Sequence, residues 1–138
     1  MKLNQECVRQ IMLTIESDIP YNHYLTKYDL INNEHLSSFS EDEILYSILR
    51  LDEAGFINCN IQPADNIPIY NLFLSSLTWS GHQFLDNVRD PEVWRKTKAV
   101  TSKLASVSLT LISNIASEVI VRMIEKALLA NWAFYFLF

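Results

Sequence analysis

The sequence predicts a mainly α-helical protein with a small β-hairpin, of α+β class: a winged helix-turn-helix followed by a C-terminal helical extension. Three observations lead to this prediction. Residues 40–55 have the pattern of a capped amphipathic helix that ends at a glycine, residues 56–75 follow as two extended runs around a turn, and a new helix start lies at Asp90-Pro91. A helix, a glycine and a hairpin in this order are typical of a recognition helix and its wing. We therefore divide the chain into a winged-helix domain at 1–90, a helical extension at 91–126 and an apolar aromatic tail at 127–138.

The first predicted helix runs from about Asn4 to Glu16. Its apolar residues recur at spacings of three and four, which places them on one helical face. They are Val8, Ile11, Met12 and Ile15. The helix should end before Pro20, because a proline disfavours helical geometry at the residue that precedes it. The first residues are polar and show no secretory signal, so we expect a cytoplasmic protein.

Residues 18–40 leave two interpretations open. A short helix near residues 27–33, containing Leu30 and Ile31, would precede the capped helix as in a helix-turn-helix. A short strand at His23 to Lys27, added to the wing, is the competing interpretation. We favour the helix.

The central helix should begin at Glu41. Ser40 and Glu43 form a capping box, in which the hydroxyl accepts from the amide of residue 43 and the carboxylate accepts from the amide of residue 40. Five apolar side chains then fall within an arc of roughly 160°, the stripe of a core-facing helix. They are Ile44, Leu45, Ile48, Leu49 and Leu51. Asp52 lies inside this arc as its one polar residue, and Gly55 supplies the left-handed conformation that ends a helix.

The predicted hairpin follows directly. Apolar Ile57, Cys59 and Ile61 alternate with polar residues, which is the period of a half-buried strand. Turn residues occupy positions 63–66, a second extended run spans 67–75, and Thr78 is the expected N-cap of the next helix. The apolar face of that helix comprises Phe84, Leu85 and Val88.

Several of these segments resemble one family. Leu51-x-x-Ala54-Gly55-x-Ile57 and Leu77-Thr78-x-x-Gly81-x-x-x-Leu85 are typical of winged-helix regulators. Together with MKLNQECVRQIML at the start, LTWSGHQFLDNVRDPEVWRKTK and KLASVSL, they resemble the uncharacterised bacterial and phage-associated family catalogued as domain of unknown function 2513. The resemblance covers about residues 1–125 and implies a small winged-helix-like protein, with no activity or catalytic residue to carry over. The segment ALLANWAFYFLF departs from it, since a short charged ending is expected there.

The helical extension begins with Asp90 as N-cap and Pro91 at the first helical position. Apolar residues then repeat at spacings of four and three, which predicts a heptad seam. The seam consists of Val93, Thr97, Val100, Leu104, Val107 and Leu111. Ser106 and Ser108 leave open whether this is one long helix or two helices at 91–105 and 108–126. Residues 104–117 carry no charge, so we expect them to be buried against the winged domain or a second copy of the chain.

The tail at 127–138 is uncharged, rich in aromatic residues and too short to span a bilayer, which needs about 20 apolar residues. Three interpretations stay open: packing on the core or on a partner, interfacial contact with a membrane, or a poorly ordered tail. We place membrane contact behind packing on protein.

Composition limits the chemistry. Two glycines, both assigned to helix ends, leave no glycine-rich phosphate loop. We expect Cys7 and Cys59 to be buried free thiols. The three histidines lie on separate elements without metal-ligand spacing, and Ser80-Gly81-His82 with Asp86 lacks the arrangement that acyl transfer needs. The cluster at 41–43 suits a helix N-terminus. We therefore predict no enzyme activity, catalytic residue, metal or cofactor.

The distribution of charged residues along the chain indicates which kind of partner it can bind. Residues 1–90 hold five Lys or Arg and thirteen Asp or Glu, whereas residues 91–138 hold six and three. The central helix would present Asp42, Glu43, Tyr46, Ser47, Arg50 and Glu53 to solvent, and its net charge of −4 over 41–54 is ill suited to phosphate contacts. We therefore expect a protein-binding module, with a homodimer through 104–117 as one form of it. The alternative is a DNA-binding regulator. Its candidate contact residues are Tyr46, Ser47, Arg50, Arg95, Lys96, Lys98 and Lys103.

Overall fold

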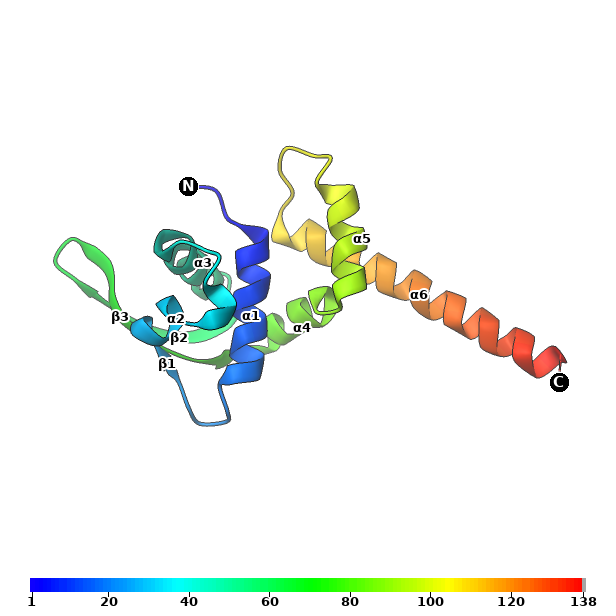
Figure 1. Ribbon diagram of the computed structural model, residues 1–138, viewed down its shortest axis with the longest axis horizontal. Coiled ribbons are helices and arrows are strands. Elements are labelled where there is room, and N and C mark those ends of the chain that lie inside the picture. Colours follow the sequence, from blue (N-terminus) through cyan, green and yellow to red (C-terminus); the bar gives the residue numbers. More distant parts are fainter. Residues whose placement is uncertain (138) are drawn as a thin grey trace. The chain divides into compact units, whose positions relative to one another are not determined.

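The computed structural model describes residues 1–137 and divides into two compact units, Met1–Leu85 and Asp86–Phe138, which we describe separately. The protein is mainly helical with one three-stranded antiparallel sheet, which confirms the α+β class (Figure 1). The division between the units falls inside helix α4 (Trp79–Val88).

The first unit begins with helix α1 (Gln5–Asp18), two residues longer at its end than predicted. The side-chain oxygen of Asn4 accepts from the amide of Cys7 and caps the helix, and the helix stops before Pro20 as expected. The predicted apolar face is buried, together with Cys7. Through this face α1 contacts helix α3 (Glu41–Glu53) and strand β3 (Ile67–Leu77).

Both interpretations of residues 18–40 prove correct. Strand β1 (Leu25–Thr26) pairs with β3, placing Leu25 opposite Leu74, and it runs directly into helix α2 (Lys27–Ile31). Thr26 and Asp29 form a capping box at this junction. A short 3-10 helix, η1 (Glu34–Leu36), was not predicted; it buries Leu36 below the turn into α3.

Helix α3 begins at Glu41 with the predicted capping box in place. The Glu43 carboxylate also accepts from the side-chain amide of Asn4 at 2.6 Å, so one carboxylate links the N-termini of α3 and α1. These hydrogen bonds, the one from Asn4 foremost, lower the pKa of Glu43. At the other end the amides of Gly55 and Phe56 donate to the carbonyls of Asp52 and Leu51, and Gly55 has φ of 73°. This is the predicted glycine-terminated helix end.

The sheet has the order β1-β3-β2, with β3 in the centre. Strand β2 (Ile57–Ala64) and β3 meet at a two-residue turn, where Asn66 has a positive φ. The alternation predicted for β2 is present, with Ile57 buried and Cys59 half-buried. One face of β3 supplies core residues, and these are Ile69, Leu72, Leu74 and Leu77.

Two glycine positions are joined where α3, β2 and α4 meet. Thr78 caps α4 by accepting from the amide of Gly81 at 3.1 Å, and its own hydroxyl donates to the carbonyl of Gly55. The Thr78 amide donates to the carbonyl of Phe56 at 3.0 Å. Gly81 lies against that same carbonyl, which leaves no room for a side chain. Thus the two motifs that carry the family resemblance contact each other.

The second unit contains helices α5 (Pro91–Thr101) and α6 (Leu109–Leu137). Asp90 caps α5 as predicted, accepting from the amides of Glu92 and Val93. The two-helix alternative is confirmed: Ser108 accepts from the amide of Leu111 at the start of α6, while α5 stops at Thr101. Helices α5 and α6 pack against each other, and Ile112 and Ala116 of α6 are buried.

The predicted heptad seam is wrong. Val93 and Thr97 are buried, but Val100, Leu104 and Leu111 are 55%, 62% and 54% exposed. The chain turns after Thr101, so residues that would lie on one face of a continuous helix are split between a helix, a loop and a second helix. Within the single chain residues 104–117 are not buried as a stretch, since only Ile112 and Ala116 among them are buried. Burial of this segment against a second copy stays a prediction.

The tail is the last part of α6 and not a separate or irregular segment. From Ala127 to Leu137 it is helical, and each of these residues is exposed. Within the described residues the tail therefore does not pack on the core of its own unit. Across residues 1–137, no helix has both the length and the hydropathy that crossing a membrane requires.

Candidate functional site

The solvent side of α3 carries one basic residue, Arg50, and this residue is paired with an acid of the same helix. Arg50 makes an ion pair with Glu53 at 3.0 Å, and its guanidinium lies 5.2 Å from the centre of the Tyr46 ring. The remaining charged residues of the helix are all acidic. Of the predicted contact residues on α3, Tyr46 is half-buried and Arg50 is exposed, so both are accessible.

Ser47 was expected on this exposed side, and that expectation is wrong. Its relative exposure is 0%, because α1 packs over it. The Ser47 hydroxyl makes no hydrogen bond of good geometry with any described residue, and the group that it influences is the Cys7 thiol. Burial raises the pKa of Cys7, and Ser47 opposes that rise. Ser47 therefore cannot contact a partner and belongs to the core.

Beside the exposed face of α3 lies a groove of about 350 Å³, formed with the start of β3. Its walls are largely apolar, and they include Leu45, Leu49, Ile67, Pro68 and Ile69. Leu45 and Leu49 are half-buried, and Ile67 is 45% exposed. The groove is thus a hydrophobic hollow on the accessible side of the unit.

Acidic groups line the same groove. Glu41 and Asp42 are exposed at the N-terminus of α3, and Lys27 is the one basic residue in the lining. The Lys27 ammonium donates to the carbonyl of Ile69 at 2.9 Å, which anchors it to the sheet. The site therefore combines an apolar floor with a rim that carries two carboxylates, the Lys27 ammonium and Met1.

Sequence reasoning assigned Leu45 and Leu49 to the core and so missed the groove. A signal was present in the width of the predicted apolar arc. The buried residues of α3, Ser47 included, span roughly 100° of the helix, whereas Leu45 and Leu49 lie beyond them at the far edge of the arc. An arc much wider than the core needs indicates apolar residues left over for another surface.

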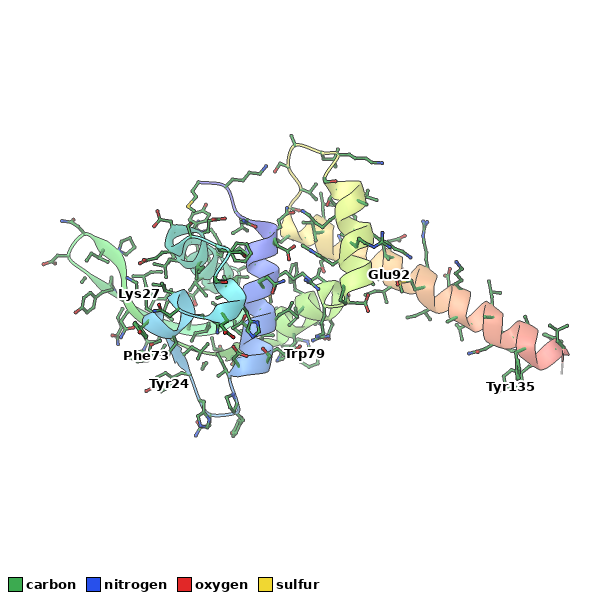
Figure 2. The ribbon with its side chains drawn as sticks, viewed as in Figure 1. Tyr24, Lys27, Phe73, Trp79, Glu92 and Tyr135 are labelled. Carbon is green, nitrogen blue, oxygen red and sulfur yellow. The ribbon has the colours of Figure 1, made fainter. Side chains whose placement is uncertain are left out.

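A second hollow, of about 660 Å³, lies between residues 19–24 and the sheet. The rings of Tyr24 and Phe73 meet edge to face with their centres 5.2 Å apart. Both side chains are labelled in Figure 2. Asn58, Asn60 and His23 add polar groups. The lining contains no acid and no Lys or Arg, so this hollow offers stacking and amide contacts.

Apart from Arg50, the basic residues predicted as contacts lie in the second unit. The Arg95 and Lys96 side chains are 71% and 44% exposed, and both approach one carboxylate, that of Glu92, at 3.9 and 3.4 Å. Lys98 lies 5.6 Å from the centre of the Trp94 ring, and Lys103 is exposed after the end of α5. One acid therefore faces two bases, which leaves this stretch positive.

Both cysteines are free thiols. Cys7 is buried as predicted, whereas Cys59 is half-buried. Burial raises the pKa of Cys59 to about 12, with a further contribution from the carboxylate of Asp52. A thiol held in the neutral form is a poor nucleophile. Among residues 1–137 no group of three His, Cys, Asp or Glu side chains is placed to hold a metal ion.

The fold and surface define a small α+β protein with an acidic, groove-bearing helix and hairpin. The family model described as "Hypothetical protein (DUF2513)" matches residues 2–108, and the chain belongs to this family. An uncharacterized protein of Haemophilus influenzae is 29% identical over 125 residues, which are 90% of this chain and 99% of that protein. No solved structure matches the chain. The whole of α6 lies beyond the residues that the family model covers.

Proposed function

We propose that this chain is a non-enzymatic winged-helix interaction module that binds protein through the groove between α3 and β3. The order of elements supports a winged helix: α2 and α3 follow each other as in a helix-turn-helix, and the β2–β3 hairpin that follows α3 corresponds to a wing. A third strand, β1, lies between α1 and α2 in the sequence and pairs with β3. In this arrangement α3 takes the place of the recognition helix.

The observation that carries the proposal is the chemistry of the α3 surface. Nucleic-acid binding depends on Lys and Arg that neutralise phosphates. Here the corresponding helix presents Glu41, Asp42 and Glu53, and its only base is held by Glu53. An apolar groove with two carboxylates at its rim suits instead a partner segment that inserts hydrophobic side chains and carries Lys or Arg at its flank.

A photocrosslinking amino acid placed at Leu49 tests this proposal in the producing cells. We expect a discrete adduct with a protein that is lost when Leu45→Glu places a charge in the groove. The matched control carries the crosslinker at Tyr70, which is 64% exposed but does not line the groove. Equal adducts from both positions, or an adduct that survives Leu45→Glu, would overturn the assignment of the groove.

A DNA-binding regulator is the second candidate, and the excess of exposed bases near Arg95 favours it. In this hypothesis the DNA phosphates are contacted by Arg95, Lys96, Lys98 and Lys103. The side chains of Tyr46 and Arg50 approach the nucleobases. Fluorescence anisotropy of a labelled mixed-sequence duplex at about 50 and 200 mM salt separates the candidates. Protein binding predicts no signal even at low salt.

Micromolar binding that weakens steeply with salt would instead support the regulator. Arg95→Glu with Lys96→Glu should then abolish it. Arg122→Glu is the control for a general loss of positive charge, because the Arg122 side chain is 79% exposed and lies on α6 instead of α5. Full affinity in the double variant would exclude phosphate contacts by α5.

A further inference from the structure

Helix α6 bears a row of exposed apolar side chains along its second half. They are Val121, Ile124, Leu128, Trp132 and Tyr135, between 49% and 78% exposed. At 100° per residue they fall within roughly 80° of the helix surface, so they form one stripe. No charged residue lies within the stripe, because Arg122, Glu125 and Lys126 lie to one side of it. Exposed apolar patches of this length mark interaction surfaces.

The spacing within the stripe is symmetric. Its five residues follow each other at intervals of three, four, four and three, so the pattern has the same order in both directions from Leu128. When two such helices lie antiparallel across a two-fold axis at Leu128, each stripe residue meets a stripe residue of the other copy. Val121 then faces Tyr135, and Ile124 faces Trp132. Two-fold interfaces use the same surface of both partners, which is the condition that this spacing meets.

A groove of about 360 Å³ opens beside the stripe, between α5 and α6. It is lined by Val93 of α5 and by Ile120, Met123, Ile124 and Ala127 of α6, with Asp90 at its edge. Ile124 belongs to both the stripe and the groove. The Asp90 carboxylate is occupied by the amides at the start of α5, so the groove is open to uncharged side chains.

We propose that two copies of the chain pair antiparallel through α6, with the aromatic end of each helix lying along the α5–α6 groove of the other. This inference goes beyond the α3 groove of the proposed function, and it places self-association at residues 120–137 instead of the predicted residues 104–117. The aromatic end is apolar on all sides, and Phe136 is 84% exposed. In the pairing about Leu128, Phe134 of one copy lies between the levels of Ile120 and Ile124 of the other, on the flank where these residues line the groove.

The available area suits a modest dimer. Side chains half or more exposed, two of them aromatic, provide about 500 Å² on each copy, or about 1,000 Å² in total before the groove contributes. This is near the lower limit for a specific interface and predicts a dissociation constant of about 1–100 μM. A lipid surface would also cover an apolar helix end, but it requires neither the symmetric spacing nor the groove.

Sedimentation equilibrium of the full chain over about 1–200 μM tests the proposal. We expect a monomer–dimer equilibrium that Leu128→Glu weakens at least about 100-fold, because two carboxylates would meet on the symmetry axis without compensation. Leu111→Glu is the matched control: Leu111 is 54% exposed on the same helix but lies outside the stripe. If Leu111→Glu abolishes the dimer and Leu128→Glu does not, association occurs through 104–117 and the proposal is wrong.

Cysteine trapping provides a second readout that does not depend on stability. Leu128→Cys in a Cys59→Ala background should form an intermolecular disulfide under mild oxidation, whereas Leu111→Cys should not. A monomer at every concentration overturns the proposal. If that monomer co-sediments with phosphatidylcholine–phosphatidylserine vesicles, the occupant is lipid. Crosslinking from Leu49 is measured separately and should not respond to Leu128→Glu, so failure of the dimer is distinguishable from failure of the α3 groove.

Discussion

The contact between Gly81 and Phe56 gives a direct test of how α3, β2 and α4 are joined. In Gly81→Ala the added methyl would overlap the carbonyl oxygen of Phe56 and lie 3.0 Å from its carbon and 3.3 Å from its Cα. These are backbone atoms, and they cannot rotate away as a flexible side chain does. The carbonyl also accepts the amide of Thr78, so any movement that relieves the overlap weakens that hydrogen bond.

The expected cost follows from three contributions. Overpacking against backbone belongs at the upper end of about 1–3 kcal/mol. The weakened hydrogen bond adds about 1 kcal/mol, and the better helix propensity of alanine returns about 1 kcal/mol. Gly81→Ala should therefore lower the free energy of unfolding by about 3 kcal/mol. For a slope of about 2 kcal/mol/M, the urea midpoint falls by about 1.5 M.

The other glycine provides the control. Gly55 has nothing within 4 Å of an added methyl, so Gly55→Ala meets only the left-handed conformation at φ of 73°. That conformation costs an L-residue about 1 kcal/mol. Urea unfolding followed by circular dichroism should rank the variants as wild type, Gly55→Ala and then Gly81→Ala. If Gly81→Ala costs no more than Gly55→Ala, the argument from the Phe56 contact is refuted.

Three further predictions concern single side chains. Because the hydrogen bond from Asn4 lowers the pKa of Glu43, its carboxylate stabilises the fold above its ordinary pKa of 4.5, and this contribution is lost as pH falls through the lowered value. Glu43→Gln should flatten the dependence of the urea midpoint on pH below about pH 5, and an unchanged slope would exclude the linkage. Ser47→Ala should leave stability unchanged or raise it by up to about 1 kcal/mol, since it removes a buried hydroxyl without a good partner; a loss above about 1 kcal/mol would show that the hydroxyl is needed. Cys59 should react with a disulfide reagent at pH 8 at least about 100-fold more slowly in the folded protein than in urea, and Asp52→Asn should raise the folded rate; equal rates in both states would contradict the raised pKa.

The α6 pairing and the α3 groove make different demands on the chain. The groove lies in the first unit, within the residues that the family model matches, whereas the stripe lies beyond them. Relatives can therefore share the α3 surface and differ in α6. Comparing the self-association of variants in α6 with crosslinking from α3 separates the two surfaces experimentally.

Features that depend on a few neighbouring residues could be predicted from the sequence alone. Ser40 and Glu43 fixed the start of α3, Gly55 its end, and Asp90 the start of α5. In each case the hydrogen bonds span at most five positions, so the necessary partners lie close to one another in the chain. Alternation in β2 was predictable for the same reason, because the strand period is a local property.

Which surfaces remain exposed depends on how the helices and strands pack in three dimensions. Ser47 is buried because α1 covers it, and Leu45 and Leu49 line a groove because β3 starts beside them. Pairing of Leu25 with Leu74 joined strands that lie far apart in the sequence, and the turn after Thr101 separated residues that a continuous helix would align. Hydrophobic periodicity identifies the residues that can be buried, but burial itself depends on which element packs against them. For that reason the helices could be predicted from the sequence, while the groove and the α6 stripe could not.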